Sequence, residues 1–478
     1  MALTKAHNRM IEGAPVNVRD YGAVGDGVTD DTDAINAAIA AASPSGKVIL
    51  SSNKTYIVRG INPPSDFHLD FNGSTLKSKD LAHNPIFFDP VGGKSGFILE
   101  NAKMDCNMAN NAINVTGGVW LTDWNDIQLL GKTEIYNCYR EGINLYNCKN
   151  VVADSYEFYN SGLSTGPTSN AGYGLTLNSN ASGDCSRVYF RNIYIHDVIG
   201  FGIHLLGASH VTLDNVVIAN MRAPSSIGIT YTYADNVSIN NMSIDGVNGD
   251  AHEINASTNI SVNNLKISNT GGRGLIFGDN GSGGFNENVV LKNVKLSSIG
   301  TTHLAGSHIK KVELHNLYTT DALFSLGLSI SDSTNTKLYL NNCKIPFGVI
   351  KRPYVKVKDC YVTDYDMYAS KLTTVIELEK RFYLGTSDSF TFPLYNNLPL
   401  TSGRIEAFVY FTASASQCST ISKLYMYDGS SISLSAGDVL TGAVNRQLTY
   451  TMSSNSGLIA TNNSGTPLHC AVNLTQYI

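Results

Sequence analysis

A short pattern recurs along the middle of the chain and restricts the fold more than any other feature. Each copy alternates apolar and polar residues and ends in asparagine. The copies are VYFRN (188–192), VTLDN (211–215), VSINN (237–241), ISVNN (260–264), VVLKN (289–293), VELHN (312–316) and LYLNN (338–342). Their final asparagines are 23, 26, 23, 29, 23 and 26 residues apart, and a period of roughly 20–30 residues built from short strands is typical of a solenoid. Because one rung cannot bury its own apolar face, the rungs are expected to stack.

Degenerate copies occur earlier, at FILEN (97–101) and VVADS (151–155). A second strand precedes six of the copies, and a short third strand follows the asparagine, as in NIYIHD (192–197). The preceding strands are GINLYN (142–147), GLTLNS (174–179), GIHLLG (202–207), GITYTY (228–233), AHEINA (251–256) and GLIFGD (274–279). Three strands per rung, all pointing the same way, predict an all-β fold, a parallel β-helix. Asparagines stacked about 4.8 Å apart at one turn can hydrogen-bond one another. We therefore expect them to satisfy polar groups buried at a corner of the helix.

The segment VNVRDYGAVGDGVTDDTDAINAAIAAA (16–42) begins like a dinucleotide-binding unit, with a strand, a glycine loop and a helix. Its glycines Gly22, Gly25 and Gly27 read G-x-x-G-x-G, which is not the nucleotide-binding spacing G-x-G-x-x-G. The acids of DDTD (30–33) suit the positive end of a helix dipole and would repel a phosphate. The short amphipathic helix 30–42 is instead predicted to cover the exposed first rung of the solenoid.

Composition narrows the class of protein further. The 478 residues carry a net charge of −5, which predicts no nucleic-acid partner. The first residues lack the apolar core of a signal peptide, and no apolar run reaches the roughly 18 residues of a membrane helix, so no membrane insertion is expected. The eight cysteines show no metal-ligand spacing. They predict no metal site and a chain made in a reducing cytosol, with mostly buried free thiols that include Cys343 and Cys360.

The repeat gives way to other patterns near the end of the chain. We expect the β-helix, with its capping helix, to span residues 21–370 and a linker to span residues 371–384. RIEAFVYF (404–411) and SKLYMY (422–427) alternate as antiparallel strands do. The charged residues of 401–478 are only Arg404, Glu406, Lys423, Asp428, Asp438 and Arg446. Residues 385–478 are therefore predicted to form a β-sandwich whose surface is largely covered, either for trimerisation or for carbohydrate binding.

The stretch TKAHNRMIEGAPVNVRDYGAVGDGVTDDTDAINAAIAAA (4–42) resembles the start of the β-helix in bacteriophage tailspikes of the pectate-lyase-like, right-handed β-helix superfamily. MIEGAPVNV is its more specific part, and D-G-V-T-D-D-T is shared with other β-helix enzymes. The resemblance implies a homotrimeric virion spike, assembled in the host cytoplasm, that binds and usually cleaves a bacterial surface polysaccharide. It also implies an N-terminal arm (1–20) that joins other phage tail or baseplate proteins, and it implies no cofactor.

The candidate site follows from the register, because no catalytic motif of the pectinases is found. The outward residues of the preceding strands form one column: Asn144, Thr176, His204, Thr230, Glu253 and Ile276. Glu253 is its only carboxylate and His204 its only imidazole, about 9.6 Å apart at two rungs. Asp250 begins the rung of Glu253, Arg273 holds the matching position one rung later, and Arg222 lies in an irregular loop on the same edge. Glycosidic bonds are usually cut by two carboxyl groups, about 5 Å or about 6.5–9.5 Å apart.

Glu253, Asp250 and His204 are thus the predicted catalytic residues, and Arg273 and Arg222 are predicted to bind substrate. Simpler structural explanations compete with these roles: Asp250 and Arg273 could form a plain salt bridge, and His204 could be a solvated strand residue. A site between subunits cannot be read from one chain, so further acids stay as alternatives, namely Glu141, Asp154 and Glu157.

Two long insertions, at 159–174 and 278–288, flank the same face, and solenoid insertions tend to wall a binding groove. Tyr146, Tyr173 and Asn178 lie between or beside them and are predicted to bind sugar through aromatic platforms and fixed hydrogen bonds. Three functions fit these features. They are hydrolysis of a capsule, exopolysaccharide or lipopolysaccharide, β-elimination by a lyase whose base is His204 or a tyrosine, and receptor binding by a non-catalytic adhesin.

Overall fold

The computed structural model describes residues 14–43, 46–82, 84–111, 117–162, 172–180, 184–278, 281 and 283–321, then Cys343 and the strands from Leu326 to Tyr477. The chain divides into two compact units. The first unit holds the residues up to Phe285 together with Ser297–Thr301. The second unit holds Asn286–Leu296 and Thr302–Ile478.

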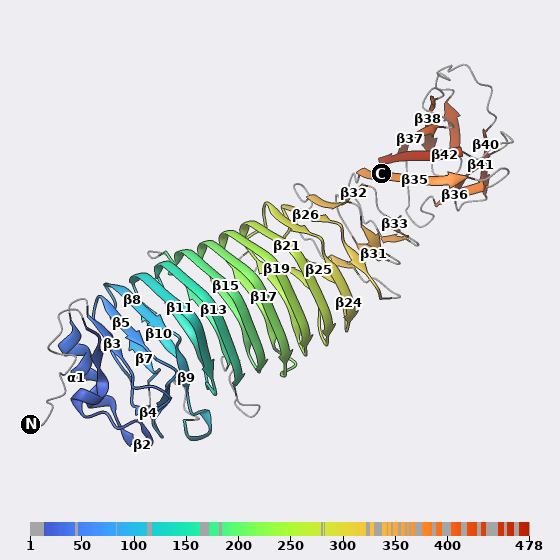
Figure 1. Ribbon diagram of the computed structural model, residues 1–478. Helices are drawn as coiled ribbons and strands as arrows, with labels where there is room; N and C mark the ends of the chain where they lie inside the picture. The colour runs from blue at the N-terminus through green and yellow to red at the C-terminus, as the bar shows by residue number, and fades with distance from the viewer. Residues whose placement is uncertain are drawn as a thin grey trace, which may run out of the picture. The chain divides into compact units, whose positions relative to one another are not determined.

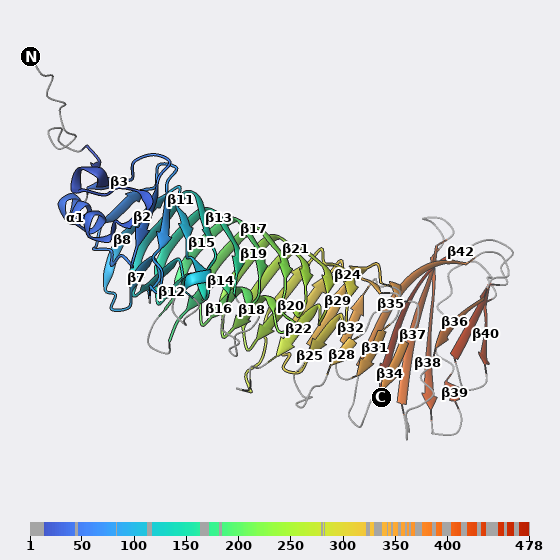
Figure 2. The ribbon, with the colours of Figure 1, turned by 90° about the horizontal axis from the view of Figure 1, so that it is seen from below.

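The first unit is a parallel β-helix, as the repeat predicts (Figure 1). One of its walls consists of short strands: β7 (Phe87–Asp89), β10 (Val119–Thr122), β12 (Glu141–Tyr146), β14 (Tyr173–Asn178), β16 (Phe201–Leu206), β18 (Ile227–Thr232), β20 (Asp250–Asn255) and β22 (Leu275–Gly278). Each pairs in parallel with the next, and Figure 2 shows them side by side. We call the outward side of these strands the short-strand face.

The other walls are formed by the short strand β9 (Lys103–Asp105) and by longer strands: β8 (Lys94–Glu100), β11 (Trp124–Tyr136), β13 (Lys149–Ser161), β15 (Ser186–Val198), β17 (Ser209–Met221), β19 (Asp235–Val247) and β21 (Thr258–Thr270). The sequence predicts separate second and third strands here, and the structure joins them into one. The long strands bend at asparagines with positive φ, 52° at Asn192, 56° at Asn215 and 58° at Asn241. Asparagine tolerates this left-handed conformation better than most residues, so the bend does not interrupt the strand.

The asparagine ladder predicted at this bend is confirmed. The side-chain amide of Asn215 donates to Asn192 Oδ1 at 3.1 Å, Asn241 donates to Asn215 at 3.1 Å, and Asn264 donates to Asn241 at 2.8 Å. The expectation that the ladder serves buried groups is wrong, because these asparagines are exposed. Their stacked amides hold a left-handed bend at the surface of the helix.

Several short strands begin with glycine because the β-helix is too crowded at that position for a side chain. A Cβ atom on Gly174 would lie 2.5 Å from the carbonyl oxygen of Gly202 and 2.7 Å from Ile195 Cδ1. Such contacts are far below van der Waals separation, so no larger residue fits without displacement of the neighbouring rung. This explains why GINLYN, GLTLNS, GIHLLG and GITYTY share their first residue.

Helix α1 (Thr32–Ala42) lies at the N-terminal end of the first unit (Figure 1). It packs against strands β1 (Val16–Asn17) and β3 (Lys47–Ile49) and the 3-10 turn Val18–Tyr21, and it buries Ile35 and Ile39. The remaining strands of this end are β2 (Asp26–Asp30), β4 (Thr55–Val58), β5 (Phe67–Asp70) and β6 (Thr75–Ser78). The helix therefore caps the β-helix, as predicted, although it begins two residues later than expected.

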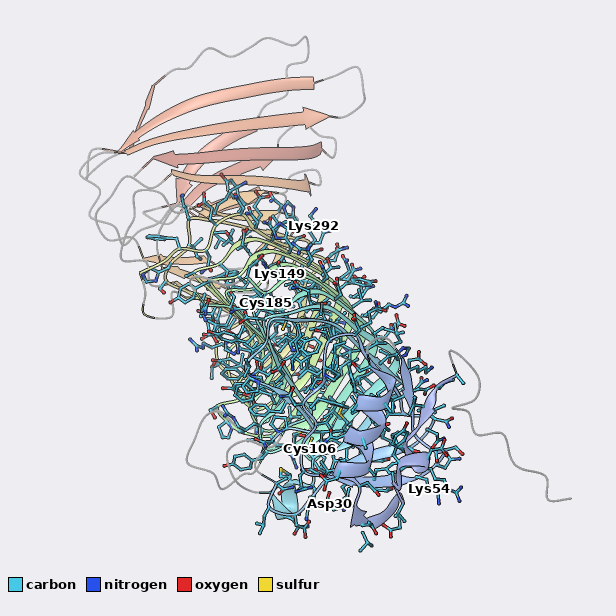
Figure 3. The ribbon with its side chains drawn as sticks, turned by 90° about the vertical axis from the view of Figure 1, so that its left-hand side faces the viewer. Asp30, Lys54, Cys106, Lys149, Cys185 and Lys292 are labelled. Carbon is cyan, nitrogen blue, oxygen red and sulfur yellow. The ribbon has the colours of Figure 1, made fainter. Side chains whose placement is uncertain are left out.

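The acids before the helix bind the glycine loop itself. Asp31 accepts hydrogen bonds from the backbone N–H groups of Val24 at 2.7 Å and Gly25 at 3.0 Å. Asp30, labelled beside the helix in Figure 3, forms an ion pair with Arg59 at 2.9 Å. Because a carboxylate already occupies the amides of the loop, the loop has no phosphate-binding character, in agreement with the sequence analysis.

The cysteines within the described residues are free and buried: Cys106, Cys138, Cys148, Cys185 and Cys343. Figure 3 labels Cys106 and Cys185 among the side chains of the helix. The prediction of buried thiols is confirmed for these positions, including Cys343. Cys360 lies outside the residues whose side chains are described.

Parallel strands continue over residues 289–368, as β23 (Val289–Lys292), β24 (Lys295–Ile299), β25 (Leu304–Gly306), β26 (Lys311–His315), β27 (Tyr318–Thr319), β28 (Leu326–Leu328), β29 (Lys337–Asn341), β30 (Lys344–Ile345), β31 (Gly348–Lys351), β32 (Val355–Lys358), β33 (Tyr361–Val362) and β34 (Tyr365–Tyr368). The ladder recurs in the second unit, where Asn316 donates to Asn293 Oδ1 at 2.7 Å.

Antiparallel strands form the C-terminal part, as RIEAFVYF and SKLYMY predict. One sheet contains β35 (Val375–Leu384), β37 (Gly403–Thr412), β38 (Cys418–Tyr427), β39 (Ile432–Ser435) and β42 (Leu468–Tyr477), and a smaller sheet contains β36 (Ser389–Pro393), β40 (Leu448–Ser453) and β41 (Gly457–Asn462). The stretch 371–384, expected to be a linker, includes β35. Since β35 pairs along its whole length with β42, it is a strand of this sheet rather than a linker before it.

Candidate functional site

The register predicted for the short strands is confirmed on the short-strand face. Parallel pairing aligns Asn144 with Thr176, Thr176 with His204, His204 with Thr230, Thr230 with Glu253, and Glu253 with Ile276. The neighbouring column aligns Tyr146 with Asn178. The candidate residues of these two columns therefore share one face of one sheet.

Glu253 is a half-buried carboxyl group on strand β20. Burial raises its pKa above the ordinary value, a hydrogen bond from Asn255 lowers it, the negative charge of Asp250 raises it, and Arg273 lowers it. The net shift is upward, so the carboxyl group holds its proton to a higher pH than a solvated glutamate does. This property suits a general acid.

Asp250 and Arg273 form the salt bridge that the sequence leaves open. Arg273 donates to Asp250 through its backbone N–H at 2.7 Å and through its guanidinium at 2.6 Å from NH2 to Oδ2. The ion pair raises the pKa of Arg273. Asp250 is thus held in place three residues before Glu253 on the same strand, about 10 Å away along an extended backbone.

His204 is packed among aromatic rings rather than solvated. It meets Phe201 edge-on with ring centroids 5.6 Å apart, and Tyr173 edge-on at 6.0 Å. Burial lowers the pKa of His204 to about 4. The imidazole is therefore neutral at pH 7, which excludes a role as a general acid there and leaves it as a weak base or hydrogen-bond partner.

The predicted sugar-binding residues occupy three different environments. Tyr173 is nearly buried and stacks on Phe201 with parallel rings 4.6 Å apart, and burial raises its pKa to about 12. Tyr146 is half-exposed at the end of β12. The amide nitrogen of Asn178 donates to Asn144 Oδ1 at 3.3 Å. One ring face of Tyr173 is thus already covered, whereas Tyr146 is open to a ligand.

Arg222 is exposed in the predicted loop and forms a hydrogen bond with the preceding rung. Its guanidinium donates to the carbonyl oxygen of Asp197 at 2.7 Å, at the end of long strand β15. Asp197 lies one rung before Arg222, whereas Asp250 lies one rung after it. This hydrogen bond connects the loop to the rung before it, and the role of Arg222 in substrate binding stays a prediction.

The structure adds three residues that the sequence analysis did not place on this face. Phe88 and Trp120 continue the column of Glu253 toward the N-terminus. Glu141 begins the strand of Asn144, is nearly buried, and has its pKa raised by that burial. VWLT (119–122) alternates as the later short strands do and follows two glycines, so an earlier start to the alignment of rungs would have found Trp120.

Among the residues that the structure describes, no group of three or more His, Cys, Asp or Glu side chains is arranged to hold a metal ion. Within the same residues, no helix has the length and apolar character needed to cross a membrane.

Acid is expected to destabilise the fold through the half-buried His204 and the fully buried His252. Burial lowers the pKa of His204 to about 4 and that of His252 to about 3, against about 6.5 in an unfolded chain. As the pH falls, the two histidines are therefore protonated at a higher pH in the unfolded chain than in the folded protein. The stability is complete above about pH 6.5 and falls toward pH 4, by up to about 1.4 kcal/mol per pH unit for each histidine.

Urea unfolding at pH 6.5 and pH 5 tests this dependence. His204→Gln should lose about 2 kcal/mol less than the parent over this interval. The exposed His210 supplies the matched control, and His210→Gln should behave as the parent. Glu253 acts oppositely, since its contribution is present below about pH 4.5 and is lost as the pH rises through its raised pKa. Glu253 is present in the parent and in both variants, so its contribution cancels in the comparison. Equal losses of unfolding free energy for the parent and for His204→Gln would contradict the prediction.

Two family models match the chain. Residues 15–249 match the family described as rhamnogalacturonase A/epimerase, pectate lyase-like, and residues 181–346 match the right-handed β-helix region. Among characterised proteins, Depolymerase 1 of Klebsiella phage K5-2, which is capsule-specific, is 35% identical over 132 residues. The matched part is 27% of this chain and 16% of that relative.

Two solved structures are similar to the chain at low sequence identity. The catalytic unit of the GH87 alpha-1,3-glucanase from Streptomyces thermodiastaticus is 16% identical, with 77% of this chain and 72% of that chain covered and a TM-score of 0.49. The tailspike protein of Acinetobacter phage vB_ApiP_P1 is 13% identical, with 97% and 87% covered and a TM-score of 0.37.

Proposed function

We propose that this chain, which belongs to the pectate-lyase-like right-handed β-helix proteins, is a phage tailspike depolymerase that cleaves a bacterial surface polysaccharide by hydrolysis. The observation that carries the proposal is the group formed by Glu253, Asp250 and Arg273 on the short-strand face. Two carboxyl groups whose surroundings differ in this way can divide the roles of acid and base. The local similarity to a capsule-specific phage depolymerase supports a polysaccharide as the substrate.

Each residue of this group has a distinct task in the proposed hydrolysis. Glu253 gives its proton to the glycosidic oxygen as the bond from the anomeric carbon to that oxygen breaks. Asp250 accepts a proton from a water molecule that attacks the anomeric carbon from the opposite side. Arg273 orients Asp250 through its backbone N–H and its guanidinium. The spacing of about 10 Å along the strand is just beyond the roughly 6.5–9.5 Å of inverting pairs and far beyond the roughly 5 Å of retaining pairs, so the proposed hydrolysis inverts the anomeric carbon.

A polysaccharide lyase is the second candidate, and the neutral His204 is the observation that favours it. An unprotonated imidazole whose ring meets the ring of Tyr173 edge-on could remove the proton next to a uronate carboxylate. The leaving oxygen would then depart with a proton from the tyrosine, and a double bond would form without the addition of water. The pKa of about 4 for His204 makes it a weak base, so we place hydrolysis first.

Incubation with purified capsular polysaccharides, exopolysaccharides and lipopolysaccharides tests the proposal. New reducing ends without ultraviolet absorbance of an unsaturated uronate would support hydrolysis. New reducing ends with that absorbance would support β-elimination and reject hydrolysis. Binding with no new reducing ends from any glycan would reject an enzyme and identify an adhesin.

We also propose that the chain is a homotrimer in the phage tail, with residues 1–20 as the arm toward other tail or baseplate proteins. The scarcity of charges over residues 401–478 supports a covered C-terminal surface. Light scattering at micromolar concentration should give three times the mass of the 51.5 kDa chain, and a monomer mass would reject this proposal.

A further inference from the structure

An aromatic pair begins the column that leads to Glu253. Phe88 on β7 and Trp120 on β10 are neighbours in the register, and their rings meet edge-on at 5.7 Å with an interplanar angle of 80°. Both are half-exposed on the short-strand face. Because each ring is fixed by the strand and by its partner, the pair presents a rigid apolar surface.

Polar atoms without partners lie between this pair and the acids. Thr176 is only 2% exposed, and its Oγ1 has no hydrogen-bond partner among the described residues. The Oδ1 of Asn178 is also buried and without a partner there. Buried polar groups are satisfied in most proteins, so these two atoms mark places on the short-strand face where a ligand hydroxyl group can supply a missing hydrogen bond.

The three features are aligned along the axis of the helix. The pairing sequence β10, β12, β14, β16, β18 and β20 is continuous, so Trp120 lies five strand spacings from Glu253, or about 24 Å. That span accommodates several pyranose rings. A sugar chain has apolar C–H patches that pack on aromatic faces and hydroxyl groups that bind free donors and acceptors. This row of residues provides both kinds of partner.

We propose that Phe88 and Trp120 form a sugar-binding subsite remote from the acids, so that a linear glycan lies along the short-strand face. Asn144, Thr176 and Asn178 bind its hydroxyl groups between the two ends. The inference that the glycan extends toward Glu253 rests on the proposed function. Binding at Phe88 and Trp120 does not, since it requires no cleavage.

The two tryptophans of the chain permit a direct test. Trp120 is half-exposed, whereas Trp124 is fully buried. Titration of Glu253→Gln, used to prevent cleavage, with the same panel of purified bacterial polysaccharides should change the tryptophan fluorescence. The same titration of Glu253→Gln/Trp120→Phe, which retains only Trp124, should give no change.

Trp120→Ala should weaken binding of a long polysaccharide about tenfold, equivalent to about 1.4 kcal/mol. It should raise KM for the polymer, with kcat unchanged, and leave the hydrolysis of short oligosaccharides as in the parent. Tyr194→Ala is the matched control, because Tyr194 is 40% exposed on long strand β15. This control should leave affinity and KM unchanged.

Each of the other outcomes rejects the subsite, the proposed function or both. Cleavage with no effect of Trp120 on fluorescence, affinity or KM would overturn the subsite and leave the proposed function intact. Trp120-dependent binding without cleavage would overturn the proposed function and leave the subsite. A lower oligomer mass for Trp120→Ala in light scattering would show that the face contacts a second copy of the chain, and would overturn the subsite. Failure of every glycan to bind would reject both.

Discussion

Replacement of Glu253 by glutamine should lower the rate of polysaccharide cleavage at least about 100-fold, the usual scale for loss of an acid–base group. Glutamine has the size of glutamate and can retain a hydrogen bond with Asn255, but it has no acidic proton to give to the leaving oxygen. The raised pKa of Glu253 lets the parent side chain keep this proton to a higher pH than a solvated glutamate does. The loss should therefore appear in kcat, with glycan affinity and melting temperature close to those of the parent.

A second acid on the chain provides the matched control for this variant. Glu157 lies on long strand β13, where it pairs with Lys132, and Glu157→Gln makes the same chemical change away from the short-strand face. Glu157→Gln should cleave at the parent rate. If it is inactive while Glu253→Gln is active, the acids that cleave the glycan lie on the long strands and the site proposed here is wrong.

The register of the rungs could be predicted from sequence because it depends on local alternation. Inward and outward residues alternate along a strand, and the repeat aligns one strand with the next. Thr230 and Glu253 accordingly lie in one column, as predicted. The ladder of Asn192, Asn215 and Asn241 follows for the same reason, since each position is set by its own rung.

The surroundings of the site could not be predicted in the same way, because they depend on side chains from other rungs. His204 points outward as expected, yet the rings of Tyr173 and Phe201 bury it and lower its pKa. Arg222 lies in the predicted loop, but a carbonyl group of the preceding rung binds its guanidinium. The alternating pattern predicts the side of the strand on which a side chain lies. The partners of that side chain depend on the shape of the side chains around it.

Removal of residues 1–42 should convert the protein into an aggregating species. This change removes α1 and β1 and exposes the backbone edge of β3 and the apolar residues beneath the helix, among them Val48. Unpaired strand edges and uncovered apolar surface both promote association between chains. Size-exclusion chromatography should show high-mass material, and removal of residues 1–13 alone, which retains α1, should not.

A graded variant tests whether packing of the helix is the cause. Ile35 is fully buried beneath α1, and Ile35→Ala should reduce the free energy of unfolding of the capped end by about 2–5 kcal/mol. The neighbouring Asn36 is exposed on the same helix, so Asn36→Ala should change stability by less than about 0.5 kcal/mol. Hydrogen exchange of the β1 and β3 amides measures both effects locally. If the protein without residues 1–42 stays soluble and melts like the parent, α1 does not protect the end of the β-helix.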